Sequence, residues 1–321
     1  MHVLKKVGVI CFLAFFVLNA GLMLYFGRET FQVTSNAQQP PRSTYHFVLI
    51  SEEVDNEYWR LVEKGAEAAS RKHNVHLDYW GPKQANNEEQ LTFIDKAIAS
   101  KVDGIMTQGV ASDTFSYLVN KSIQKGIPLI TVDTDAPDSV RQAYVGSDNY
   151  LAGKLAGETM VKQTTGQQKV GIVTGRFDAS NQQLRVKGFK DAVSHVSRIQ
   201  IAGIGESNIT KSGAIQATYE LLKSHRNITA FYGTSALDGL GISQVASLYQ
   251  QKKRPFIVAF DTLPETLTLL NKHKIDATVA QYPFVMGERA VETLFALKKG
   301  TNPGPLQYTK TDIITNLKGG H

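Results

Sequence analysis

Short apolar runs alternate with amphipathic stretches along residues 46–299, and this alternation restricts the fold more than any other feature of the chain. Residues 128–132 are almost continuously apolar, as expected of a strand with both sheet faces covered. Residues 87–100 instead place apolar side chains, among them Leu91 and Ile94, at helical spacing. Strict alternation of strands and helices implies parallel sheets joined by right-handed crossovers. The sequence therefore predicts an α/β fold.

The alternation restarts near Asp148, which divides the chain into two series. Asp148 or Asn149 can cap a helix over residues 150–163. Two series imply two doubly wound parallel-sheet lobes. The expected strands are 47–51, 75–80, 103–107, 128–132 and 143–146 in the first series, and 169–173, 199–204, 230–233, 255–260 and 277–280 in the second. The expected helices are 61–72, 87–100, 112–125, 150–163, 180–195, 210–224, 236–250, 264–272 and 284–299.

Composition excludes several classes of protein. A chain of 321 residues suits about two domains. The net charge is +6, yet no basic stripe is interleaved with aromatics, so no nucleic-acid partner is expected. The single cysteine, Cys11, excludes an internal disulfide, and the eight histidines show no metal-ligand spacing. We therefore expect no metal site.

The N-terminal segment is suited to a membrane. Residues 7–26 carry no charge and, as a helix, would span roughly 30 Å, close to the hydrocarbon thickness of a bilayer. Lys5 and Lys6 precede the segment, which predicts that residues 1–6 are cytoplasmic and that the rest is extracytoplasmic. The prediction is a single-pass protein of a bacterial cytoplasmic membrane.

A cleaved signal peptide is the alternative to this anchor. Residues 35–37, Ser-Asn-Ala, have the small residues that a signal peptidase requires. They lie beyond the apolar run, which is longer than the usual core of a signal peptide, so the length favours an uncleaved anchor. The polar, proline-containing residues 27–44 are typical of an extended linker.

Two adjacent aromatics, Tyr58 and Trp59, follow the first expected strand. Ligands of open α/β sheets bind at the carboxyl ends of the strands, where these rings would offer apolar faces with polar tips. The alternative is that both rings cap the hydrophobic core. The residues alone leave this choice open.

Other polar residues follow the strands of both series. They include Asp133 with Thr134, Arg185, Ser235, Asp261 and Gln281. No Ser/His/Asp arrangement, HExxH motif or Walker A loop accompanies them, so we expect neither catalytic residues nor a cofactor. Carboxylates accept charge-assisted hydrogen bonds from hydroxyl groups, and an arginine can donate two in parallel. The set is suited to a polyhydroxylated ligand.

At these residues the chain resembles the ribose/galactose type of periplasmic sugar-binding protein, a type I periplasmic binding protein that shares its fold with the ligand domain of LacI-type repressors. The resemblance implies two lobes joined by three crossovers that close on a sugar. The stretches that carry it are FVLISEEVDNEYWRLVEKGAE, VDGIMTQGVASDTF, IPLITVDTD, YVGSDNYLAGKLAG, LRVKGFKDAV, IVAFDTLPE and ATVAQYPFVMGERAVE.

The resemblance implies specific sugar contacts and lobe boundaries. Residues 45–147 with 282–310 would form the N-terminal lobe, and 148–281 with 311–321 the C-terminal lobe. Thr134 stands where ribose binders have an arginine, and Ser235 where an asparagine is usual, so the identity of the monosaccharide stays open. The residues that match the family's sugar contacts are Asn56, Tyr58, Trp59, Asp133, Arg185, Asp261 and Gln281.

The expected function is extracytoplasmic binding of a monosaccharide or similar small polyol, without enzymatic activity. Closure on the sugar would be recognised by a membrane partner, either a histidine kinase or an ABC permease. Two alternatives come from other classes. A LacI-type regulator would need a helix-turn-helix where the apolar segment 7–26 lies. A sugar-processing enzyme would need an acid/base pair in the cleft.

Overall fold

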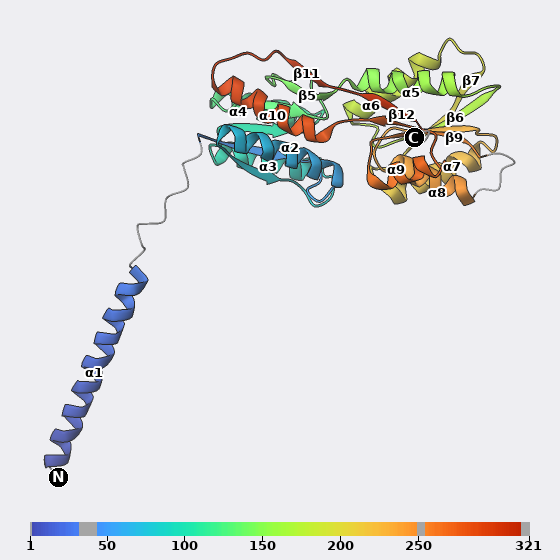
Figure 1. The fold of residues 1–321 in the computed structure, drawn as a ribbon. Coiled ribbons are helices and arrows are strands. Elements are labelled where there is room, and N and C mark those ends of the chain that lie inside the picture. Colours follow the sequence, from blue (N-terminus) through green and yellow to red (C-terminus); the bar gives the residue numbers. More distant parts are fainter. Residues whose placement is uncertain (1, 32–43, 249–253, 316–321) are drawn as a thin grey trace, which may run out of the picture. The chain divides into compact units, whose positions relative to one another are not determined.

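The computed structural model describes residues 2–31, 44–248 and 254–315 and separates the chain into two compact units, Met1–Ser43 and Thr44–His321 (Figure 1). Helix α1 (His2–Phe31) contains the stretch Lys6–Gly27, which is long and apolar enough to cross a membrane. The helix extends to Phe31, five residues into the expected linker, because Arg28 and Glu29 are good helix formers. Residues 32–43, including the expected cleavage site, lie outside the described residues.

The unit Thr44–His321 contains two six-stranded sheets with the same layout. The N-terminal sheet has the order β11-β5-β4-β3-β1-β2, and the C-terminal sheet has the order β12-β10-β9-β8-β6-β7. The N-terminal strands are β1 (Tyr45–Ile50), β2 (Val75–Trp80), β3 (Gly104–Thr107), β4 (Leu129–Val132), β5 (Tyr144–Ser147) and β11 (Leu306–Thr309). The C-terminal strands are β6 (Gln168–Thr174), β7 (Ile199–Glu206), β8 (Ala230–Gly233), β9 (Phe256–Phe260), β10 (Ala277–Ala280) and β12 (Asp312–Thr315).

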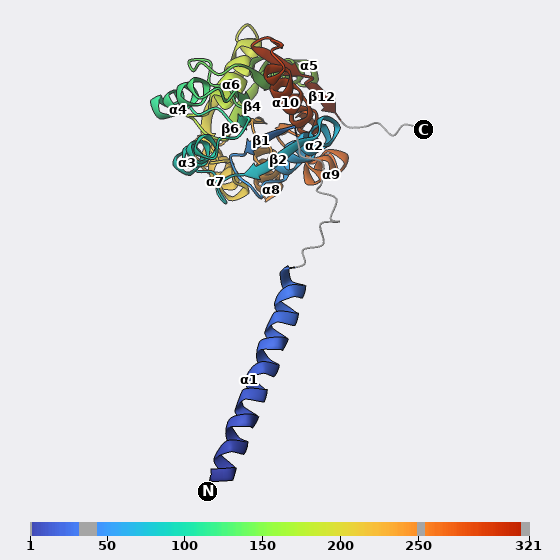
Figure 2. The same cartoon turned by 90° about the vertical axis from the view of Figure 1, so that its left-hand side faces the viewer.

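Helices cover both faces of each sheet, so each lobe has two hydrophobic cores. In the N-terminal lobe α2 and α10 cover one face, and α3 and α4 the other (Figure 2). In the C-terminal lobe α5 and α6 cover one face, and α7, α8 and α9 the other. The N-terminal helices are α2 (Glu57–His73), α3 (Asn87–Ala99), α4 (Asp113–Gln124) and α10 (Pro283–Lys298). The C-terminal helices are α5 (Asn149–Gln163), α6 (Ser180–Val193), α7 (Lys211–Ser224), α8 (Asp238–Leu248) and α9 (Pro264–Asn271).

The chain passes between the lobes three times: from β5 to α5, from β10 to α10, and from β11 to β12. The ten expected strands are all found, within two residues at either end. Strands β11 and β12 were not predicted, and β12 pairs antiparallel with β10, so the C-terminal sheet is not wholly parallel. The end of the expected helix 236–250 lies outside the described residues.

Helix α2 begins earlier than its periodicity indicates. Asn56 is the N-cap, and its side-chain oxygen accepts a hydrogen bond from the backbone N–H of Tyr58 at 3.0 Å. Tyr58 and Trp59 therefore lie in the first turn of the helix, where both are buried in the core that α2 shares with α10. The aromatic pair starts the helix and does not precede it.

Candidate functional site

Two buried aspartates mark the carboxyl edges of the sheets. Asp133 follows β4 and Asp261 follows β9, which occupy the same position in the two sheet orders. Their backbone φ angles are 66° and 65°, in the left-handed region that residues other than glycine rarely adopt. Such conformations cost free energy and recur at functional sites.

Asp133 is the hydrogen-bond acceptor at the centre of the N-terminal half of the site. Its Oδ1 accepts a hydrogen bond from the hydroxyl of Tyr58 at 2.6 Å. Its Oδ2 accepts from the hydroxyl of Thr134 at 3.2 Å and from the amide of Asn181, on α6 of the opposite lobe, at 3.2 Å. Gln108 in turn donates to Thr134 at 2.8 Å. The carboxylate is therefore held by groups from both lobes.

Arg185 is the corresponding donor on the C-terminal lobe. Its side chain is 3% exposed, and its guanidinium lies over the ring of Phe260, 4.0 Å from the ring centroid. Nε donates to Asn149 at 2.8 Å, and Nη1 donates to the carbonyl oxygen of Thr234 at 2.9 Å. Nη2 lies 3.9 Å from Asp133 Oδ1. The guanidinium is thus buried, and these contacts hold it in place.

Gln281 connects Arg185 to the second aspartate. Its Oε1 accepts from Arg185 Nη2 at 3.1 Å and from the hydroxyl of Ser147 at 2.8 Å. Its Nε2 donates to Asp261 Oδ1 at 2.8 Å. Because Gln281 lies in the crossover between β10 and α10, the contact chain from Tyr58 to Asp261 includes residues of both lobes and of the crossover.

Three expected site residues stand apart from this chain of contacts. Asn56 uses its side-chain oxygen for the helix cap, and its amide nitrogen lies 3.4 Å from Glu53. Trp59 packs edge-on against Tyr58, with ring centroids 6.0 Å apart. Ser235 is buried and lies beside Asp238, to whose carboxylate its backbone N–H donates at 2.8 Å.

Burial changes the acid–base properties of the site. Loss of solvation raises the pKa of Asp261 to about 6, although the nearby Arg185 guanidinium opposes the shift. Burial, together with the negative charge of Asp133, holds the pKa of the Tyr58 hydroxyl well above its usual value. Tyr58 therefore stays protonated and donates to Asp133.

Sequence reasoning missed Asn149, which is the partner of Arg185. The N-cap of α5 is Asp148, whose side chain accepts from Leu151 N–H at 2.9 Å. That leaves Asn149 to accept from Arg185 and to donate to the carbonyl oxygen of Asp133 at 3.3 Å. The sequence feature that could have indicated Asn149 is its position directly after the first crossover, next to the helix cap Asp148.

Sequence reasoning also missed an ion pair between the lobes. Glu52 follows β1 and Arg176 follows β6, again equivalent strands, and Arg176 Nη1 lies 3.3 Å from Glu52 Oε1. Burial raises the pKa of Glu52 to about 7, against the opposing charge of Arg176. Ser180 adds a hydrogen bond from its hydroxyl to the carbonyl oxygen of Asp135 at 2.6 Å. Glu52 and Arg176 both lie just after expected strands, but nothing in the sequence indicates that they pair across the lobes.

Two histidines group with an aspartate, although the histidines show no metal-ligand spacing along the chain. His46, His76 and Asp78 bring potential ligand atoms within 4.8 Å of one another. Spacing along the chain could not reveal this, because His46 and His76 are brought together by the parallel pairing of β1 with β2.

Comparison with known proteins agrees with the fold and with sugar binding. Residues 47–302 match the model of the periplasmic binding protein domain. The chain is similar to the crystal structure of GanP, a glucose-galactose binding protein from Geobacillus stearothermophilus, with 48% identity, 84% of this chain and 97% of that chain covered, and a TM-score of 0.82. It is also similar to the structure of a XylFII–LytSN complex, with 34% identity, 84% and 97% covered, and a TM-score of 0.79.

The match to a curated relative covers most of both chains. The D-ribose/D-allose-binding protein of Pseudomonas aeruginosa is 24% identical over 277 residues, which cover 83% of this chain and 85% of that protein. The chain therefore belongs to the periplasmic binding protein domain family and carries an extracytoplasmic sugar-binding domain of the ribose/galactose type.

Proposed function

We propose that this protein binds a monosaccharide or similar small polyol between its two lobes and that a membrane partner recognises the closed form. The observation that carries the proposal is the buried chain of contacts from Tyr58 through Asp133, Arg185 and Gln281 to Asp261. Two carboxylates and a guanidinium in one buried network are suited to polyol recognition, because they can accept and donate charge-assisted hydrogen bonds.

Sugar hydroxyl groups would replace hydrogen bonds that these side chains now make with one another. Asp133 and Asp261 would accept from hydroxyl groups, and Arg185 would donate to ring or hydroxyl oxygens. The buried hydroxyl of Ser235 is a further polar group that the ligand would contact. Tyr58 fixes the Asp133 carboxylate, and with Trp59 and Asn56 it would form the N-terminal wall of the site.

Closure would be a shift between open and closed populations. The contacts between Glu52 and Arg176, Asp133 and Asn181, and Asp135 and Ser180 all join the lobes. They are the contacts that opening would break. For the lobes we propose the boundaries 45–147 with 282–310 and 148–281 with 311–321, with the three crossovers as the hinge.

The partner would be a sensor histidine kinase or an ABC sugar importer. The XylFII–LytSN structure supports recognition by a second protein, since a relative 34% identical to this chain forms that complex. The apolar stretch Lys6–Gly27 favours sensing, because a receptor for import gains from diffusing between permeases. We propose that this stretch is an uncleaved anchor in the cytoplasmic membrane.

A second candidate function is chemistry on the bound sugar. The observation that favours it is the raised pKa of two carboxyl groups near the interface of the lobes, Asp261 at about 6 and Glu52 at about 7. Each, however, faces a fixed donor, Gln281 or Arg176, which suits binding better than proton transfer. Two of the proteins compared above, GanP and the Pseudomonas aeruginosa protein, are named as binding proteins.

One titration separates the two candidates. The full chain in detergent is titrated calorimetrically with glucose, galactose, ribose, allose, xylose and arabinose. We expect saturable binding of one of them with a stoichiometry of one, and a recovered sugar with an unchanged NMR spectrum. A chemically altered sugar would establish the enzyme, and absence of heat with every sugar would count against binding.

A further inference from the structure

A cluster of His46, His76 and Asp78 lies away from the sugar site. His46 is the second residue of β1, whereas the candidate sugar contacts follow the opposite, carboxyl end of the strands. β2 is the edge strand of its sheet, and the cluster joins it to β1. Nothing in sugar binding requires these side chains.

Strand register creates the cluster. His46 and His76 are direct partners in the parallel pair, so their side chains project on the same face. Asp78 lies two residues after His76, and side chains two apart in a strand share a face. The three side chains therefore converge without any loop rearrangement.

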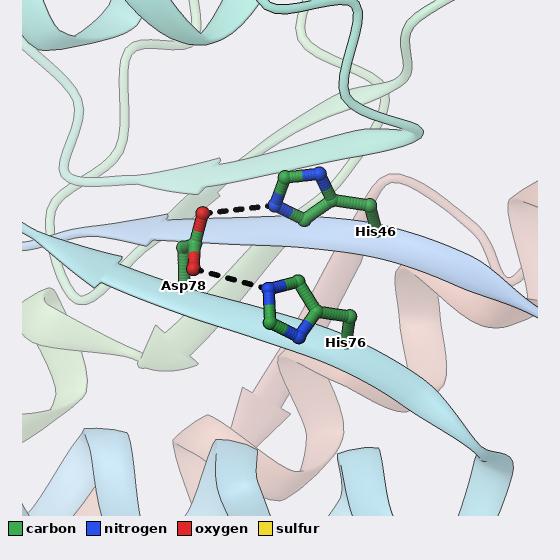
Figure 3. Close-up of side chains that lie close together, drawn as sticks. All are labelled: His46, His76 and Asp78. Carbon is green, nitrogen blue, oxygen red and sulfur yellow. Dashed lines mark hydrogen bonds and ion pairs between the residues drawn. The ribbon is translucent and has the colours of Figure 1, made fainter. Parts of the chain in front are cut away.

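The rings already present one nitrogen each to the carboxylate (Figure 3). His46 Nε2 lies 2.9 Å from Asp78 Oδ2, and His76 Nε2 lies 3.3 Å from Asp78 Oδ1. A tetrahedral zinc ion with ligands at roughly 2.0–2.1 Å needs ligand atoms roughly 3–3.5 Å apart. The two distances, measured to different oxygens of Asp78, are close to that range, and one ligand atom from each of the three residues lies within 4.8 Å of the others.

The backbone beneath the cluster is held in place. The N–H of His46 donates to Asp103 Oδ2 at 2.9 Å, and the carbonyl oxygen of His46 accepts from Asp103 N–H at 2.7 Å. Lys298 in turn lies 3.4 Å from Asp103 Oδ1, so that carboxylate is already paired. The backbone of His46 is thus fixed, and the potential ligand atoms of the three residues already lie within 4.8 Å of one another.

We propose that His46, His76 and Asp78 bind a divalent transition-metal ion of the zinc class. Two imidazoles and one carboxylate favour zinc and its neighbours over magnesium or calcium, which prefer oxygen ligands. The side chain of His76 is 58% exposed and that of Asp78 31%, so solvent can supply a fourth ligand. The ion would cross-link the edge strand β2 to β1.

Metal binding to the full chain tests this inference. The protein is purified without a polyhistidine tag, stripped with chelator and titrated with Zn²⁺ by calorimetry, with Mg²⁺ for comparison. Co²⁺ binding is followed by its visible absorption. We expect one Zn²⁺ per chain, no Mg²⁺ heat, and visible Co²⁺ bands.

The variants His76→Gln and Asp78→Asn each remove one ligand while keeping the side chain polar. Since changes to groups that merely support a ligand cost about 10–100-fold in affinity, losing a ligand should raise the Zn²⁺ Kd at least about tenfold. His195→Gln, at an exposed histidine outside the cluster, should leave the Kd unchanged. Zn²⁺ binding that is absent in the parent, or equally tight in both ligand variants, would overturn the proposal. Sugar titration of the same variants tests the proposed function separately, because the metal proposal can fail while sugar binding is intact.

Discussion

Asp133 and Asp261 are structural equivalents: each is the residue directly after the fourth strand of its lobe, and each has a φ angle near 65°. Asp133 is approached from the opposite lobe by Asn181 and Arg185, and Asp261 is approached from the crossover by Gln281. The two halves of the molecule thus direct the same kind of carboxylate at the same interface.

Neutralising either aspartate should weaken sugar binding. A hydrogen bond to a charged group contributes about 1.5–3 kcal/mol, so Asp133→Asn and Asp261→Asn should each raise the sugar Kd by roughly 10–150-fold. Calorimetric titration measures the change. Asp138→Asn, at an exposed position in the loop after Asp133, is the control and should bind normally. An unchanged Kd in either site variant removes that residue from the site.

The ion pair between Glu52 and Arg176 should favour the closed form. Glu52→Gln keeps the shape of the side chain but removes its charge, so the sugar-free protein should open and show a larger radius of gyration in X-ray scattering. Asp178→Asn is the matched control, since Asp178 also pairs with Arg176 but from the same loop. Equal radii for the two variants would show that the interlobe pair does not hold the lobes together.

Asp261 should make the sugar-free protein less stable as the pH rises. Its folded pKa, about 6, is above its ordinary value of 3.8, so its contribution is present below about pH 4 and is lost as the pH passes about 6. A gap of about two units corresponds to at most roughly 3 kcal/mol. Urea unfolding across this range should give a smaller pH dependence of stability for Asp261→Asn than for the parent. Some pH dependence should remain in the variant, because the pKa values of Glu52 and Asp238 are also raised. Identical slopes would show that Asp261 is not the titrating group.

Gly153 lies where α5 packs against α6, next to the backbone of Arg185. A Cβ on Gly153 would lie 1.9 Å from the carbonyl oxygen of Arg185, so Gly153→Ala must push α5 away from α6. We expect a loss of about 1–3 kcal/mol in the free energy of unfolding, together with weaker sugar binding. Gly65→Ala is the comparison, because its Cβ would lie 1.8 Å from the carbonyl oxygen of Phe284, where α2 packs on α10. Binding should fall further in Gly153→Ala, and an equal loss in both would mean that displacement of Arg185 does not matter.

The alternation of strands and helices was enough to predict the two lobes, because buried parallel strands and amphipathic helices have distinct periods. Strands β11 and β12 were not predicted. Leu306 in β11 is exposed, and each strand pairs with a strand that lies much earlier in the chain, β5 and β10 respectively. The linker was predicted to begin at residue 27, but α1 extends to Phe31.

The site was predictable where it obeys the strand-end rule, as at Asp133 and Asp261. It was not predictable where tertiary packing assigns the partner, as for Asn149 with Arg185. The ring of Tyr58 is buried in the core, as the core-capping interpretation has it, while its hydroxyl reaches Asp133, so a contact between Tyr58 and a ligand stays a prediction.

Thermal melts of the full chain and of Asp261→Asn, each with a panel of monosaccharides, address sugar binding most simply. A ligand that binds only the folded state raises the melting temperature by mass action. We expect one sugar to raise the melting temperature of the parent, and to raise that of Asp261→Asn by less at the same sugar concentration. A melting temperature that no sugar shifts, or an equal shift in both proteins, would contradict a sugar site at Asp261.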